Sequence, residues 1–227
     1  MDWRTAVALA AATLALAGTV CAADPSEFSV AETKIFVDDH LRGVPASTTL
    51  EYTYTKRGSL EDPIDDVARV IVGPASVGGS HSVKVQYLSG TRALELADID
   101  AANANPVILY FLEHDIREMH RLTGGSTSYF RKRIRMALAE GGKLATPTVD
   151  VGSRHVAATQ IRIAPYRDDP ARSRYERFAD KTYVFTLSDE IPGKVVELHS
   201  EVLASPSAAG AAGEIVIAET LRFAGKR

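Results

Sequence analysis

The sequence contains a single cysteine, Cys21, which lies within an N-terminal segment, residues 1–23, that is typical of a secretory signal. The mature chain predicted after its removal, residues 24–227, has no thiol. An exported protein reaches a compartment that permits disulfides, so without cysteine it must be held together by its hydrophobic core alone. We expect residues 24–227 to form one domain, since their number is compatible with a single core.

The secretory signal is predicted from the order of charged, apolar and small residues. Arg4 provides the charged start, and residues 6–17 form an apolar stretch too short to span a bilayer comfortably. Cleavage is expected after Ala22 or Ala23, which gives an exported, periplasmic protein. A lipid anchor on the cysteine requires a small residue before it, and Val20 does not meet that requirement.

Net charge, long apolar runs and internal repeats are also scarce or missing in the sequence. The 26 basic and 29 acidic side chains give a net charge of −3, so neither nucleic acid nor another polyanion is implied as a partner. After the signal no apolar run is long enough for a transmembrane helix. We also find no internal repeat.

One stretch, residues 105–140, has the pattern of two helices joined by a short break. Asn105 is a favourable N-cap, and Pro106 suits the first helical position, where its missing N–H is no loss. Gly124 and Gly125 tolerate the backbone that ends a helix. The first helix has a broad apolar arc, which predicts that this face is buried. The arc comprises Val107, Ile108, Leu109, Phe111, Leu112, Ile116, Met119 and Leu122.

The rest of the mature chain predicts about nine β-strands joined by connections too short for helical crossovers, so we expect antiparallel pairing. The predicted fold class is α+β, a curved antiparallel sheet wrapped as a half-barrel around the helical hairpin. We also expect a strand at 35–37, a short helix ending at Phe178 and a flexible loop at 205–213. The main strands are predicted at 48–55, 65–72, 82–88, 92–96, 148–151, 155–164, 182–187, 194–203 and 214–223.

This order of segments, with a late strand hairpin built on the SDEIPG turn at 188–193, resembles that of bacterial periplasmic half-barrel proteins. The lipoprotein carriers of the outer-membrane sorting system are the best-known members. The block from NPVILYFLEHDIREM to YFRKRIR is similar to a family of exported proteobacterial proteins of unassigned activity. The resemblance implies the half-barrel architecture and names no activity.

Asp115 is an acidic residue within the apolar arc of the first predicted helix. The second predicted helix contains the basic run RKRIR at 131–135. An ionised carboxylate in an apolar face is costly unless it is paired. We therefore predict an ion pair between Asp115 and Arg131 or Arg135 that fixes the hairpin angle. The alternative for Asp115 is an acid of raised pKa in a cleft, and the RKRIR run has the alternative of binding phosphate or an anionic headgroup.

Several other patterns have a chemical and a structural interpretation, and the structural one is favoured in each. His114 and Glu118 stand one helical turn apart but lack a third metal ligand, so a surface contact is expected. Residues Asp38 to His40 could form a ligand cluster, but they are better explained as a turn with capping aspartates. Gly124 to Ser128 lies between helices, which does not match a nucleophile elbow.

We expect a non-catalytic binding or carrier module of the periplasm, which holds an apolar or amphiphilic ligand against the concave sheet. The candidate ligand-binding residues are Tyr52, Tyr54, Phe111, Met119 and Phe185. The alternatives are an envelope structural or assembly factor that binds another protein and, ranked last, a hydrolase or metal enzyme, because no acid–base or ligand set has suitable spacing. We expect no cofactor and no metal.

Overall fold

The computed structural model describes residues 28–94, 96–204 and 213–227. The predicted signal peptide and residues 205–212 of the predicted loop lie outside the described residues. The helical elements are α1 (Val30–Glu32), the π-helix η2 (Thr33–Val37), α2 (Val107–Thr123), α3 (Thr127–Ala139) and the 3₁₀ segments η3 (Gly90–Arg92) and η4 (Arg172–Phe178). The strands are β1 (Thr49–Arg57), β2 (Ile64–Ala75), β3 (His81–Tyr87), β4 (Ile99–Ala102), β5 (Lys143–Ala145), β6 (Thr148–Val151), β7 (Arg154–Ala157), β8 (Thr159–Ile163), β9 (Thr182–Leu187), β10 (Val195–Leu203) and β11 (Ile215–Lys226).

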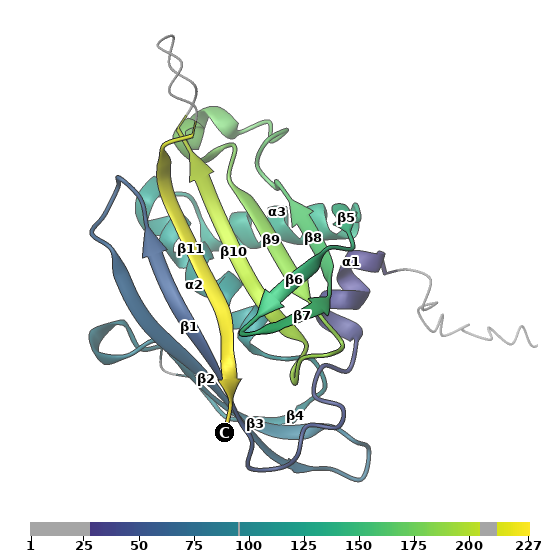
Figure 1. The fold of residues 1–227 in the computed structure, drawn as a ribbon. Coiled ribbons are helices and arrows are strands. Elements are labelled where there is room, and N and C mark those ends of the chain that lie inside the picture. Colours follow the sequence, from purple (N-terminus) through teal and green to yellow (C-terminus); the bar gives the residue numbers. More distant parts are fainter. Residues whose placement is uncertain (1–27, 95, 205–212) are drawn as a thin grey trace, which may run out of the picture.

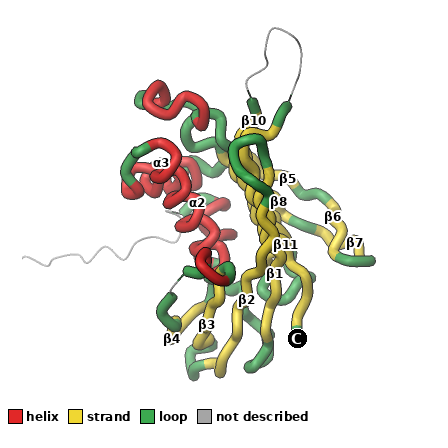
Figure 2. The backbone as a smooth tube through the Cα atoms, turned by 90° about the vertical axis from the view of Figure 1, so that its left-hand side faces the viewer, coloured by secondary structure: helices red, strands yellow, loops and turns green. Residues whose placement is uncertain are grey.

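Nine strands form one antiparallel sheet in the order β4-β3-β2-β1-β11-β10-β9-β8-β5 (Figure 1). Helices α2 and α3 cover one face of this sheet, which we call the inner face, and the β6–β7 hairpin lies on the opposite, outer side (Figure 2). The predicted α+β class is therefore confirmed. The sheet is not closed into a barrel, because its order ends at β4 on one edge and at β5 on the other.

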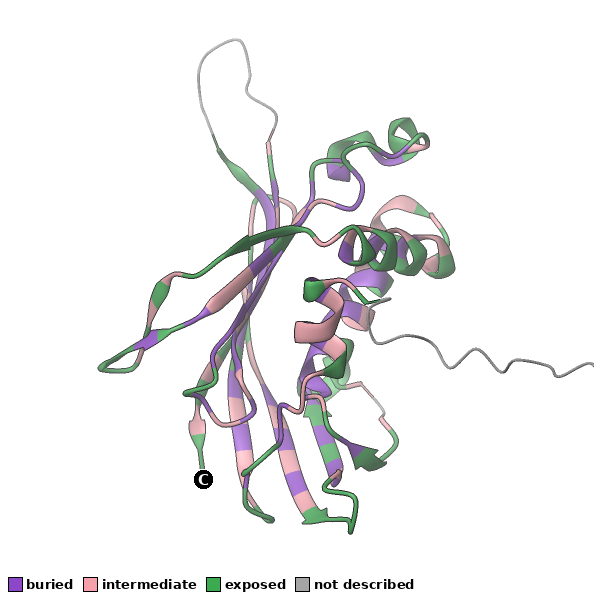
Figure 3. Cartoon of the chain, turned by 90° about the vertical axis from the view of Figure 1, so that its right-hand side faces the viewer, coloured by how far each residue is buried: buried purple, intermediate pink, exposed green. Residues whose placement is uncertain are grey.

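The two sheet faces differ because apolar and polar residues alternate along the strands. Leu50, Tyr52 and Tyr54 of β1 point to the inner face and are at most 1% exposed. On the outer face charged pairs replace them, such as Arg222 with Glu197 at 2.5 Å. The large apolar core consequently lies between the sheet and the helices, and a smaller buried cluster lies at the β6–β7 hairpin on the outer side (Figure 3).

The helical hairpin predicted at 105–140 is confirmed, although α2 begins one residue later than predicted, at Val107, with Pro106 in the N-cap position. The side-chain oxygen of Asn105 accepts a hydrogen bond from the N–H of Val107 at 3.2 Å. Gly124 ends α2 in the left-handed conformation, with φ of +71°. Ser126 caps α3 by accepting the N–H of Tyr129 at 3.2 Å. Within the described part of the chain, no helix is long and apolar enough to cross a membrane.

Three local predictions are wrong. Residues 35–37 are helical, because Ser29 and Glu32 form a reciprocal capping box that starts α1, and η2 continues it. The strand predicted at 92–96 is reduced to an isolated bridge at Leu94. The strand predicted at 155–164 is interrupted at Ala158, whose N–H donates to Pro147 instead. The short helix ending at Phe178 is confirmed as η4.

The SDEIPG turn fastens the β6–β7 hairpin to the body of the protein. Ser188 Oγ donates to the carbonyl of Ala157 at 2.7 Å, and the N–H of Ala157 donates to Glu190 at 2.9 Å. Ile191 packs with Val156 of β7 in a small separate apolar cluster. The side chains of this turn therefore have structural roles, which account for its composition.

Candidate functional site

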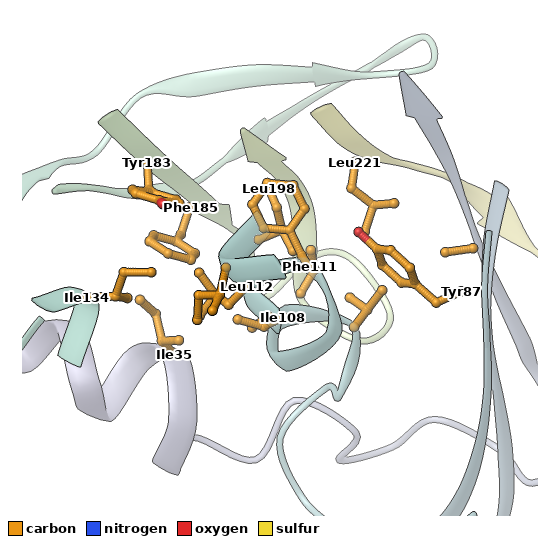
Figure 4. Packing of buried hydrophobic residues seen from close by; sticks show 14 of the residues in the cluster. Ile35, Tyr87, Ile108, Phe111, Leu112, Ile134, Tyr183, Phe185, Leu198 and Leu221 are labelled. Atoms are coloured by element: carbon orange, nitrogen blue, oxygen red, sulfur yellow. The ribbon is translucent and has the colours of Figure 1, made fainter. Parts of the chain in front are cut away.

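Helix α2 is the element that positions the polar groups of the interior. Six of the eight residues of its predicted apolar arc are buried, with Phe111 and Ile108 near the centre of the core (Figure 4). The prediction is wrong for Leu109, which is 51% exposed, and Leu122 is half-buried. His114, Asp115 and Glu118 lie on the same side of the helix and also face the sheet. Their partners come from strands far away in sequence, so the site exists only in the folded protein.

The first polar cluster surrounds Asp115, which has no exposed surface. One carboxylate oxygen accepts hydrogen bonds from Lys181 Nζ at 2.5 Å and from Ser200 Oγ at 2.8 Å. The other accepts from the hydroxyl of Tyr183 at 2.6 Å. That hydroxyl lies 3.2 Å from the hydroxyl of Tyr166. Burial and the charge of Asp115 raise the pKa of Tyr183 well above its usual value, so this phenol stays protonated and donates to Asp115.

The predicted pairing of Asp115 with Arg131 or Arg135 is wrong, although the predicted need for a cation is met. Asp115 points at the sheet, so its cation is Lys181, next to β9. Arg131 instead makes two hydrogen bonds to Glu113 on the solvent side of α2, at 2.7 and 2.8 Å. Arg135 is exposed on α3 and faces away from the core.

The second polar cluster joins α2 to β1 and β11. Lys56 Nζ lies 2.6 Å from Glu118, 2.5 Å from Glu61 and 3.8 Å from Glu219. The ring of His114 donates from Nδ1 to Glu219 at 3.1 Å, which matches the ionised carboxylate. Both Lys56 and Glu219 are buried, at 5% and 0% exposure, so the charges are well shielded from water.

These charges shift the pKa values of their partners in opposite directions. Burial opposes the ionisation of Glu219, but the hydrogen bond from His114 and the nearby cations outweigh it and lower the pKa of Glu219. Burial also disfavours protonated His114, yet Glu219 raises its pKa above the ordinary value. At Glu118, Arg121 and Lys56 overcome burial and lower the pKa to about 2. The ionised forms of the cluster are thus favoured over a widened pH range.

Three buried oxygens of this second cluster have no hydrogen-bond partner among the described residues: the hydroxyls of Tyr54 and Tyr87 and one carboxylate oxygen of Glu219. The two tyrosine rings pack around the ring of His114, with centroids 5.7 and 5.8 Å away. A buried polar atom without a partner costs roughly 1–3 kcal/mol. The contact between α2 and the sheet therefore includes buried polar atoms that have no hydrogen bond from another described residue.

The start of α2 is held by a third set of buried hydrogen bonds around Asn105. Its side-chain amide donates to the hydroxyl of Tyr52 at 2.8 Å and to the carbonyl of Gly193 at 2.9 Å. Its backbone N–H donates to Nδ1 of His40 at 3.1 Å, and the other ring nitrogen of His40 meets the carbonyl of Lys34 at 2.8 Å. This arrangement gives His40, from the predicted Asp38-to-His40 turn, a structural role.

The five predicted ligand-binding residues all lie in the interior. Tyr52, Tyr54, Phe111, Met119 and Phe185 are each at most 1% exposed and belong to the one large apolar core. The structure therefore brings them together, with α2 occupying the space in front of the sheet. A ligand at these residues requires α2 to move.

The other candidate groups have ordinary structural partners. The prediction of a surface contact between His114 and Glu118 is wrong, because Glu118 is bonded to Lys56 and Arg121 and the largely buried His114 is bonded to Glu219. Across the described ranges, no three His, Cys, Asp or Glu side chains are grouped as metal ligands would be. Gly124 and the residues after it form the break between the two helices, as expected.

Sequence analysis missed Lys56, Lys181 and Glu219 as site residues. Two of them left a signal, since Lys56 follows Leu50, Tyr52 and Tyr54 in the alternating inner-face positions of β1. Glu219 likewise occupies the inner-face position between two buried apolar residues of β11. A charged residue at a strand position that points to the inner face of the sheet indicates a buried partner of opposite charge. Lys181 precedes its strand, so no such pattern marks it.

Comparison with known proteins gives no relative from which a role for these clusters could be transferred. No family model, no curated protein and no solved structure matches the chain.

Proposed function

We propose that the protein is a non-catalytic binding module of the periplasm that takes up an anionic amphiphile on the inner face of a half-barrel-like sheet. In this proposal helix α2 is a reversible cover, and the ligand replaces it. The observation that carries the proposal is the set of buried polar contacts between α2 and four strands of the sheet, at His114, Asp115 and Glu118.

The first supporting argument concerns the cost of buried charge. Replacing a buried ion pair by packed apolar residues is often neutral or stabilising, so a permanent core gains little from such pairs. Here three polar residues of one helix make buried contacts with the sheet. Polar groups that water can solvate reduce the free energy needed to separate the helix from the sheet, which suits a cover that opens.

The second supporting argument concerns the hydrogen bonding of the contact between α2 and the sheet. Among the described residues, the hydroxyl of Tyr87 has no hydrogen-bond partner, although it is buried beside His114. A polar headgroup bound there gives this hydroxyl a partner, and a buried hydroxyl without one costs roughly 1–3 kcal/mol.

The chemical class of the ligand follows from the charges that α2 contributes. Displacing α2 removes Asp115 from Lys181 and Glu118 from Lys56, while Glu219 stays on β11. Lys56 keeps Glu61 and Glu219 nearby, so Lys181 is the cation that loses its carboxylate partner. An acidic headgroup, carboxylate or phosphate, can replace Asp115 at Lys181, and an apolar chain can replace the apolar residues of α2 against Tyr52 and Phe185.

Titration with a fluorescent fatty acid tests the proposal, with native mass spectrometry of protein purified from the periplasm to detect a lipid-sized adduct. We expect saturable binding by the wild type and faster uptake by Glu118→Gln, which weakens the contact with Lys56 at the rim of the core. The matched control is Glu113→Gln, which loses a similar charge on the solvent side of the same helix.

Binding that is absent in both the wild type and Glu118→Gln contradicts the proposal. Delipidated protein that binds no amphiphile but captures one defined envelope protein supports instead a role as an assembly factor. Equal uptake rates for Glu118→Gln and Glu113→Gln contradict the role of α2 as a cover, even if the wild type binds the probe.

A further inference from the structure

A basic and apolar surface lies on the outside of helix α3, remote from the polar clusters under α2. We call it the α3 patch and define it by Lys132, Arg135 and Met136 of α3 together with Val30 of α1. These α3 residues line a shallow groove of about 460 Å³, and Glu32 of α1 contributes to the same groove. Ser29 joins the two helices by donating to the carbonyl of Leu138 at 2.6 Å.

The cations of the α3 patch are not neutralised by the protein. Arg131 is paired with Glu113, but within the described ranges no carboxylate lies within 4.0 Å of Lys132 or Arg135. Glu32 is engaged in its own capping box, where it accepts the N–H of Ser29 at 3.0 Å. Lys132 and Arg135 outnumber Glu32, the one acid in the groove lining, so the surface keeps a positive charge in a protein whose net charge is −3.

Apolar side chains are exposed beside these cations. Val30 is 58% exposed and Met136 39% exposed, and Phe28, two residues before Val30, is 52% exposed. Single exposed apolar residues are common on protein surfaces, so their exposure alone indicates nothing. Met136 lines the same groove as Lys132 and Arg135, and Val30 lies on α1, which Ser29 joins to α3. This combination is typical of segments that lie in a membrane interface, where apolar side chains enter the headgroup boundary and cations face acidic lipids.

We propose that the α3 patch docks the protein on the surface of a bilayer that contains anionic phospholipids. Lys132 and Arg135 contact lipid phosphates, and Val30 and Met136 enter the apolar boundary. A soluble acidic protein is a weaker match, because it accounts for the unpaired cations but not for the exposed Val30 and Met136. The inference does not depend on ligand uptake under α2, since an empty protein carries the same patch.

Flotation with vesicles tests the docking, using phosphatidylcholine alone and phosphatidylcholine with phosphatidylglycerol. We expect the wild type to float only with the anionic vesicles and to be released at 1 M salt, where electrostatic screening acts over about 3 Å. Lys132→Gln with Arg135→Gln should lower the partition coefficient about 30-fold, from the usual contribution of each cation near an acidic surface. The matched control is Lys84→Gln with Lys226→Gln, on β3 and β11.

Equal losses in the two double variants overturn the proposal, because net charge and not the α3 patch would then determine binding. Floating equally well with neutral vesicles overturns it as well. Met136→Ser tests the apolar contribution to vesicle binding. It should lower the partition coefficient without changing how steeply binding falls with salt concentration. Binding of glycerol phosphate in solution without vesicle flotation assigns the patch to a free phosphate and contradicts bilayer docking. All substituted residues are on the surface, and circular dichroism confirms that the variants fold.

Discussion

Replacing Asp115 with Asn is the most direct perturbation of the buried clusters, because it removes the charge with little change in shape. Lys181 is 2% exposed and has its carboxylate partner 2.5 Å away, so the variant leaves a buried ammonium without a counter-ion. The ring of Tyr183, 5.6 Å from the ammonium, compensates weakly. Stranding one member of a buried pair costs about 3–5 kcal/mol.

The expected loss is measurable by thermal and urea unfolding followed by circular dichroism. A domain of this size loses about 2–4 °C in melting temperature per kcal/mol, so Asp115→Asn should lower the melting temperature by about 10 °C. Glu113→Gln breaks the exposed pair with Arg131 and should cost at most about 1 kcal/mol. Asp115→Leu combined with Lys181→Met should recover most of the loss, since no charge is then left buried.

A melting temperature of Asp115→Asn equal to that of the wild type or of Glu113→Gln refutes this reasoning. Such a result means that Lys181 reaches water or another anion, so the cluster is not sealed. A double variant less stable than Asp115→Asn would show that Ser200 and Tyr183, left without their acceptor, contribute more than the charge does.

Two further stability changes and one pH dependence follow from the same packing. Phe111→Ala should destabilise the fold by about 3–5 kcal/mol in urea unfolding if α2 packs as a permanent core element, and by clearly less if the cover opens readily. The pKa of His114 is higher in the folded than in the unfolded protein, so its pairing with Glu219 stabilises the fold fully below about pH 6.5. This stabilisation is lost as the pH rises through the folded pKa. The urea midpoint of His114→Gln should therefore decline less over this pH range than that of the wild type. Gly193→Ala should lower the melting temperature, since φ is +75° and a Cβ there would clash with Leu50.

The parts of the fold that could be predicted are those set by local pattern. The apolar arc of α2 agrees with the structure except at Leu109 and Leu122, and Gly124 ends the helix as predicted. The side chain of Asn105 accepts the N–H of Val107, although Pro106 holds the N-cap position. Alternation in β1 and β11 likewise placed Tyr54 and Leu221 inside. The strand at 35–37 was wrong because a capping box earlier in the chain decides that segment, and the apolar run alone does not reveal it.

The candidate site could be predicted only in part, because its contacts depend on the register of distant strands. Asp115 was recognised as a buried acid in need of a cation, which is a local inference. Its partner was assigned to α3 because that helix is adjacent in sequence, whereas Lys181 comes from the sheet 66 residues away. Nothing in the spacing of residues distinguishes a helix face that meets its neighbouring helix from one that meets the sheet.

The order of strands also determines when the sheet can be completed. β11, the last strand of the chain, is the centre of the sheet, where it pairs with β1 on one side and β10 on the other. Strands β1–β4 and β5–β10 can each pair locally, but the first half and the second half have no strand contact until the final segment is available. The closing contacts, such as Leu50 with Lys226, join residues from opposite ends of the chain, a topology that slows folding. Loss of the last dozen residues would therefore split the protein into two sheets with open edges, instead of trimming an edge strand.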